Sequence, residues 1–255
     1  MSSHTALSLW QTQALRLTAF PGPGFAPTDT TWWADLVGQP PESRLSQPRL
    51  AMYSSEGPFD QGRLVLRLQF DRIDWVLSAF DKPTTDTQGL PTLGGLPAVL
   101  STFVGLMSSW LDSDACPALV RLAFGAVLLQ QVTTREEGYR QLAPYLHSVR
   151  LDPLRSSDFL YRINRPRDSA CAITGLRINR LSTWSVVLQK SGALVIRPGT
   201  AFLLQPSTED YACRLELDIN TVPGSGPELP RRQIAQVFQE LVTLGSEMAE
   251  KGEIP

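Results

Sequence analysis

Apolar and polar side chains alternate with a period of two along residues 63–70, the clearest such pattern in the chain. The apolar members are Leu64, Leu66, Leu68 and Phe70. This period predicts a strand with one face in the core and one in solvent. Residues 73–77 continue the pattern on the opposite parity, so a two-residue turn at residues 71–72 would place Phe70 opposite Ile73. Because Asp-Arg is a poor turn pair, a bulge within one long strand is the alternative.

Several other segments have the composition and alternation of strands. They are residues 14–20, 49–54, 120–132, 159–188, 201–204 and 213–220. The segment 120–132 is almost continuously apolar, which predicts a central strand buried on both faces. Between these strands we expect a Gly/Pro loop at residues 56–62 and a polar linker at residues 81–95.

Helical spacing of apolar residues occurs in three places. Residues 96–111 repeat apolar side chains at helical intervals, with Pro97 suited to the first turn. Thr134 and Glu137 form a capping-box pattern that opens a helix through residue 146. Residues 230–251 predict a long C-terminal helix that covers the sheet. A shorter helix is expected at residues 32–37, capped by residue 29 or 30 and ended by Gly38.

Strand groups with interspersed helices, and no regular βαβ alternation, predict an α+β fold. The expected architecture is a large, mainly antiparallel sheet covered by helices, with a long C-terminal helix. A hydrophobic content of 42% is typical of a core-forming globular protein. We expect a single domain over residues 1–255. The alternative is two intimately packed halves, 1–150 and 151–255, which one continuous sheet would join.

One short sequence occurs twice within residues 159–184. Arg162-Ile163-Asn164-Arg165 recurs as Arg177-Ile178-Asn179-Arg180. Alternate side chains of a strand point to opposite faces, so the first Arg and the Asn of each copy would share one face. If the two copies pair as a broad hairpin, they form a donor-rich patch. The candidate partner-binding residues are Arg162, Asn164, Arg165, Arg167, Arg177, Asn179 and Arg180.

Arg and Asn are the residue types that contact phosphates and base edges, and Tyr161 or Trp184 could stack on a base. The formal net charge of −2 gives no general attraction to polyanions, so nucleic-acid binding would depend on this patch alone. A protein partner is the other candidate. The third interpretation is an ordinary solvated sheet face whose arginines pair with the acids of residues 213–220.

Catalytic motifs are sparse. The chain has no phosphate-binding glycine loop, and its only histidines are His4 and His147, so we assign no catalytic residue and no cofactor. Glu216 and Asp218 share a strand face and are the candidate metal ligands, because two such carboxylates can hold Mg²⁺ in nucleases. A third acid is missing nearby, and pairing of these acids with Arg162, Arg177 or Arg180 is the simpler account.

The three cysteines, Cys116, Cys171 and Cys213, have no metal-ligand spacing, and their odd number favours a reducing compartment. The N-terminal segment lacks the pattern of a signal peptide, and no apolar run is long enough to cross a bilayer. We therefore expect a cytoplasmic protein without a membrane partner.

Three short segments resemble a known family. They are Arg121-Leu122-Ala123-Phe124-Gly125, Pro144-Tyr145-Leu146 and Leu217-Asp218-Ile219, the last before a long terminal helix. In their order the chain resembles a sporadically distributed family of uncharacterised bacterial proteins of similar length. The resemblance implies a bacterial, cytoplasmic protein with that family's fold. A patchy distribution is consistent with mobile elements or defence loci.

These observations predict a non-enzymatic accessory subunit of a bacterial multi-protein system. It would recognise a protein or nucleic-acid partner through the sheet face that carries the candidate Arg and Asn residues, which we call the Arg/Asn face. One alternative is a metal-dependent nucleic-acid enzyme that uses Glu216 and Asp218. The other is a purely structural assembly subunit with an exposed apolar interface. The sequence leaves the oligomeric state open.

Overall fold

The structure is a computed structural model that describes residues 7–28, 30–80, 90–191, 194–195, 203–204, 208–224 and 228–253. Its strands are β1 (Gln11–Pro21), β2 (Ser43–Gln47), β3 (Met52–Phe59), β4 (Gly62–Gln69), β5 (Arg72–Ser78), β6 (Leu119–Val132), β7 (Leu160–Asn164), β8 (Arg167–Asp168), β9 (Arg177–Ser191), β10 (Leu194–Val195), β11 (Leu203–Leu204) and β12 (Thr208–Thr221). Its helices are α2 (Trp32–Val37), α3 (Leu96–Asp112), α4 (Arg135–Leu142) and α5 (Ile234–Lys251), with short 3₁₀ turns η1 (Pro48–Leu50), η2 (Ala143–Tyr145) and η3 (Arg231–Gln233).

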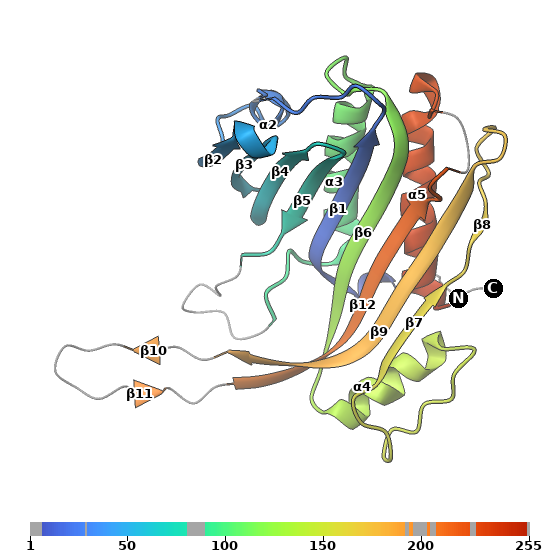
Figure 1. Ribbon diagram of the computed structural model, residues 1–255. Helices are drawn as coiled ribbons and strands as arrows, with labels where there is room; N and C mark the ends of the chain where they lie inside the picture. The colour runs from blue at the N-terminus through green and yellow to red at the C-terminus, as the bar shows by residue number, and fades with distance from the viewer. Residues whose placement is uncertain are drawn as a thin grey trace.

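One antiparallel sheet dominates the described chain (Figure 1). Its ten strands follow the order β2-β3-β4-β5-β1-β6-β12-β9-β7, with β8 paired to β9. Pairing of β6 with β12 joins the first half of the chain to the second. The sheet, its helices and the long C-terminal helix confirm the predicted α+β fold with a mainly antiparallel sheet.

The helices lie on one face of the sheet. α5 packs on β6 and β12, and α3 packs on β1 and on α5 (Figure 1). Aromatic contacts join the two layers, with ring centroids 6.4 Å apart for Phe124 and Phe238 and 5.8 Å apart for Trp75 and Trp110. Within the described ranges no helix packs on the opposite face, which we call the open face. The sheet therefore has one face covered by helices and one that no described helix covers.

The period of two explains how each strand serves both sides. On β6, Phe124 points into the helical layer, while its neighbour Gly125 faces the open side. On β12, Leu215 and Leu217 are buried, whereas Glu216 and Asp218 line the open face. The core and the open face are consequently built from alternate residues of the same strands.

Two predicted elements differ from the structure in the first half. The loop expected at residues 56–62 is largely strand, because β3 continues to Phe59 and turns directly into β4. Gly57 is needed there because a Cβ atom would lie 2.9 Å from the Trp33 ring. Pro58 is tolerated because β2 pairs only as far as Glu56, so no ladder bond needs its missing N–H. The strand expected at 49–54 begins only at Met52, after η1.

The hairpin interpretation of residues 63–77 is correct, but its turn lies one residue earlier. Gln69 pairs with Arg72, and Leu68 pairs with Ile73, so the turn residues are 70 and 71. Phe70 was expected to face Ile73 in the core and is instead 74% exposed. Leu68, and not Phe70, is the residue that lies opposite Ile73.

Several predicted boundaries are confirmed and others move. Thr134 Oγ1 accepts a hydrogen bond from the Glu137 amide at 3.2 Å, as a capping box requires, but the Glu137 carboxylate accepts from Thr133. α4 ends at Leu142 and η2 follows it. Gly38 ends α2, as predicted, with a φ of +80°. The N-cap of α2 is Thr31 instead of residue 29 or 30, and residue 29 lies outside the described residues. The expected linker at 81–95 and strand at 201–204 lie partly outside them.

We predict that Gly245→Ala destabilises the protein, because α5 packs tightly against the sheet there. A Cβ atom on Gly245 would lie 2.9 Å from Phe124 and 3.5 Å from Ile219. Overpacking of this kind costs about 1–3 kcal/mol, which urea unfolding would measure. The matched control is Gly105→Ala in α3, where no atom lies within 4 Å of the new Cβ. That control should gain about 0.5–1 kcal/mol from helix propensity, and equal losses in both variants would contradict the packing account.

Candidate functional site

The repeated Arg-Ile-Asn-Arg segments lie on neighbouring strands, as the hairpin expectation requires. β7 pairs with β9 so that Arg162 lies beside Thr183 and Asn164 beside Leu181. Asn164 donates its side-chain amide to the Asn179 side chain at 2.9 Å and accepts the backbone N–H of Arg180 at 3.0 Å. The two asparagines therefore share the open face.

The amide contact extends into a chain of hydrogen bonds across three strands. Asn179 donates to the Asn220 side chain at 3.1 Å, and Asn220 donates to Asp218 Oδ1 at 3.1 Å. This chain fixes the orientation of the Asp218 carboxylate and supplies part of its hydrogen bonding. The predicted residues Asn164 and Asn179 thus contribute to the site by orienting the Asp218 carboxylate through Asn220.

Arg165 and Arg180, the last residues of the two copies, lie on the helical side of the sheet. Arg180 is 5% exposed, and its Nε donates to the Arg165 carbonyl at 2.7 Å. Burial lowers the pKa of Arg180. Arg165 donates to Ser148 Oγ at 2.7 Å and to Glu253 at 3.3 Å. These two candidates face away from the open side.

Arg167 and Arg177 lie at the exposed end of the hairpin. Arg177 is within 3.5 Å of the Asp168 carboxylate, and Arg167 Nε donates to the Asp168 carbonyl at 3.2 Å. Both side chains are solvated beside the acid of their own strand pair. An exposed pair of this kind contributes at most about 1 kcal/mol.

Two carboxylates near the chain end attach this hairpin to the helical layer. Glu253 is fully buried and accepts hydrogen bonds from the Tyr161 hydroxyl at 2.7 Å, from Arg165 and from the Ser148 amide. Glu240 of α5 accepts from Ser169 Oγ at 2.5 Å and from the Ala170 amide at 2.7 Å. β7, β8 and β9 form a hairpin, which we call the Arg/Asn hairpin. α5 and the residues after it therefore hold this hairpin from the helical side of the sheet.

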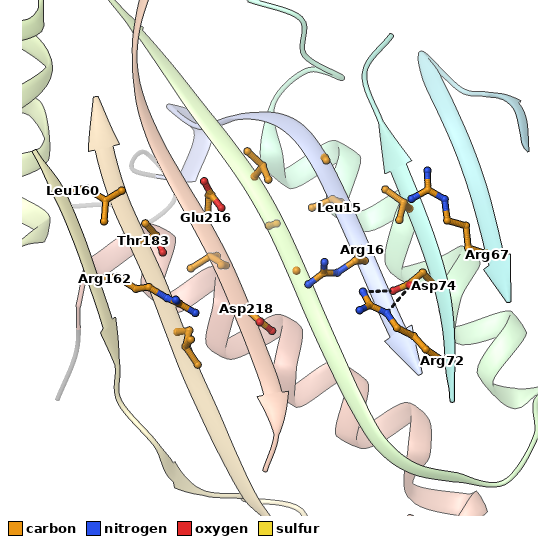
Figure 2. A pocket seen from close by; sticks show the side chains of 17 residues that line it. Leu15, Arg16, Arg67, Arg72, Asp74, Leu160, Arg162, Thr183, Glu216 and Asp218 are labelled. Carbon is orange, nitrogen blue, oxygen red and sulfur yellow. Dashed lines mark hydrogen bonds and ion pairs between the residues drawn. The ribbon is translucent and has the colours of Figure 1, made fainter. Parts of the chain in front are cut away.

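A hollow of about 780 Å³ lies on the open face (Figure 2). It extends across the sheet from β4 to β7, and Arg162 is the member of the seven candidates that lines it. The other polar lining residues are Arg16, Arg67, Arg72, Asp74, Thr183, Glu216 and Asp218. In Figure 2 Arg162 points from the β7 edge toward β12, and Arg16 lies on the other side of the two β12 carboxylates.

Arg16 is one residue of this hollow that sequence reasoning missed, together with Arg67 and Arg72. It projects from β1 over Gly125 of β6, where a Cβ atom would lie 3.2 Å from both Nε and Nη2 of the guanidinium. Its Nε is buried and has no hydrogen-bond partner among the described residues. The register places Gly125 between Arg16 and Asp218. The available signals were a lone Arg in an apolar strand and a lone Gly in a second one.

The acids of the hollow differ in how they are neutralised. Asp74 accepts from Arg72 Nη2 at 2.9 Å and from Thr18 Oγ1 at 2.6 Å, so its charge is balanced within the sheet. Glu216 forms an ion pair with Arg214 of its own strand at 3.2 Å, rather than with the hairpin arginines expected to balance it. Asp218 accepts a hydrogen bond from the side-chain amide of Asn220.

Glu216 and Asp218 do not gain further ligands from the fold. In the part of the chain that the structure describes, no three His, Cys, Asp or Glu side chains form a group able to hold a metal ion. Two carboxylates, one of them beside an arginine, are a poor donor set for Mg²⁺, which prefers several oxygens in octahedral geometry. The geometry therefore gives the metal-enzyme alternative no support.

The three cysteines are free and buried. Burial raises the pKa of Cys116 and Cys171 to about 11 and that of Cys213 to about 12. Thiols with such pKa values are protonated at neutral pH and are weak nucleophiles. They act as small core residues.

Comparison with family models, with curated proteins and with solved structures finds no match for this chain. Within the described residues, no helix combines the length and apolar character needed to cross a membrane.

We predict that Glu253→Ala loosens the Arg/Asn hairpin. The substitution leaves Tyr161 and Arg165 without their buried acceptor, which costs about 1–3 kcal/mol. Hydrogen exchange of the β7 and β9 amides should speed up, while the exposed control Glu228→Ala should leave it unchanged.

The same contact predicts a pH dependence. Burial alone would raise the pKa of Glu253, but hydrogen bonds from Tyr161, Ser148 and Arg165 outweigh it and lower the pKa below its ordinary value of 4.5. A lowered pKa stabilises the folded state above about pH 4.5 and loses that stabilisation as pH falls through the folded value. The stability difference between wild type and Glu253→Ala should therefore narrow on acidification. A difference independent of pH would contradict this assignment.

Proposed function

We propose that this chain is a non-enzymatic binding subunit that recognises a protein partner through its open sheet face. The observation that carries the proposal is the one-sided covering of the sheet. Helices bury one face, and the other holds a hollow lined by charged side chains, among them Arg16 and Arg162. The described residues of the hollow assemble no catalytic group, and a large shaped surface of this kind is typical of recognition.

The charge pattern favours a protein over a nucleic acid. Glu216 and Asp218 occupy the middle of the hollow, between the cations of β7 and β1. Phosphates laid across the hollow would meet these carboxylates, and phosphate contacts supply most of the affinity of nucleic-acid binding. A protein surface can present both signs of charge and so match the pattern.

The setting that we propose is a multi-protein system in the cytoplasm of a bacterium, with a defence locus as one context. The reduced, buried thiols support a reducing compartment. The bacterial origin and the context depend on the family resemblance of the three short segments.

We predict that Arg16→Glu/Arg162→Glu loses the partner. Reversing both charges places acids opposite the partner's acids, which costs several kcal/mol at a contact surface. The measurement is affinity purification of tagged protein from the native host, with and without nuclease, followed by mass spectrometry. A partner that survives nuclease treatment and is depleted at least about tenfold with the variant agrees with the proposal.

The matched control is Arg232→Glu, which reverses an exposed arginine outside the hollow. Thermal melting of all three proteins shows whether each remains folded. Equal recovery of the same proteins by wild type and the double variant would contradict the proposal. If nucleic acid is recovered with wild type, and is lost both with the variant and at high salt, the partner is a nucleic acid and not a protein.

A further inference from the structure

The open-face hollow has the dimensions of a single helix. It crosses seven adjacent strands, β4-β5-β1-β6-β12-β9-β7, which at about 4.8 Å per spacing gives a length of about 29 Å. β4 contributes Arg67 alone, and on each of the other six strands the lining residues span two to four residue steps, which corresponds to about 7–13 Å. An α-helix with side chains is about 10–12 Å across, and about 20 residues of helix are 30 Å long.

The middle of the hollow combines two small residues with the Arg16 guanidinium, which lies over Gly125, and the ends of the hollow carry other long side chains. Ala14 and Gly125 lie on the central strands β1 and β6, where they contribute little or no side chain. Arg162 with Leu160 forms one end, and Arg67 with Arg72 forms the other. A rod laid across the strands would therefore sit between the long side chains of β7 and those of β4 and β5.

Backbone hydrogen bonding also favours a helix as the occupant. Every strand from β4 to β9 in the sheet order is paired on both sides, so the face offers side chains and no free ladder of backbone groups. An extended segment lying on this face would leave its own N–H and C=O groups without a ladder. A helix satisfies these groups internally.

From β7 to β1 the charges along the hollow alternate in sign. Arg162 lies on β7, Glu216 and Asp218 two strands away on β12, and Arg16 two further strands away on β1. Each interval of two strands is about 10 Å, which corresponds to about seven residues, or two turns, of a helix. A complementary helix would carry an acidic residue, a basic residue about seven positions later and a second acidic residue about seven positions after that, all on one face.

We propose that the open-face hollow receives an α-helix of a protein partner, laid across the strands, with acidic, basic and acidic residues about seven positions apart. This inference rests on the proposed function and specifies its partner. The acidic residues contact Arg162 and Arg16, and the basic residue contacts Glu216 and Asp218. The Arg16 guanidinium, held over Gly125 and lining the hollow, is the donor for the second acid.

Photo-crosslinking from the two ends of the hollow tests this geometry. We would place p-benzoylphenylalanine at Leu160 or at Val76, express each variant in the native host and map the cross-linked residues by mass spectrometry. These positions lie on β7 and β5, five strand spacings or about 24 Å apart. On a helix the two cross-links should fall about 16 residues apart, whereas on an extended segment they would fall about seven apart.

Charge exchange then tests the contact itself. Arg16→Glu or, as a second variant at the exposed rim, Arg162→Glu should reduce cross-linking at least about tenfold. Reversal of the matching acidic residue of the partner to Arg should restore it. Cross-linker at Arg232 serves as the control position.

The outcomes separate this inference from the proposed function. Cross-links about 16 residues apart in one partner segment, with charge exchange that restores them, agree with the helix. Cross-links to a protein with about seven-residue spacing, or without restoration, would overturn the helix and leave a protein-binding face. Cross-links to nucleic acid, or none above the control position, would overturn both.

Discussion

The pairing of β6 with β1 on one side and β12 on the other is the constraint on which the rest of the structure depends. It joins the two halves of the chain in one sheet and places Gly125 between Arg16 and Asp218. One residue earlier on the same strand, Phe124 packs on Phe238 and under Gly245 of α5. A one-residue slip of β6 would exchange these roles and would lose the core and the hollow together.

Local patterns predicted most of the elements because their physical causes are local. Alternation specified β4, β5 and β12, helical spacing specified α3 and α5, and the Thr134 cap specified α4. The incorrect predictions occur where contacts between residues far apart in sequence determine the local structure. Gly57 suggested a loop, but it pairs with Leu64 as a strand residue, and it is glycine because the Trp33 ring leaves no room for a side chain. Phe70 continued an alternating pattern, but the chain had already turned.

The candidate site was predictable in part for the same reason. Strand parity placed Asn164 and Asn179 on one face, and the hydrogen bond between them agrees with that. Parity alone gave no sign that Arg165 and Arg180 hold the hairpin against Glu253 and α5. Arg16 was missed because its neighbours in the hollow on β5, β6 and β12 lie far away in sequence and meet it only through the sheet register.

If a protein partner occupies the open face in the cell, that face is shielded there and becomes exposed after purification. Hydroxyl-radical footprinting of the protein in its native host and after purification would detect this difference. Leu160 and Leu181 on the open face should be oxidised more slowly in the host than after purification. The exposed control residues Leu50 and Leu154, outside the hollow, should react equally in both. Equal oxidation of the open-face residues in both settings would contradict the account.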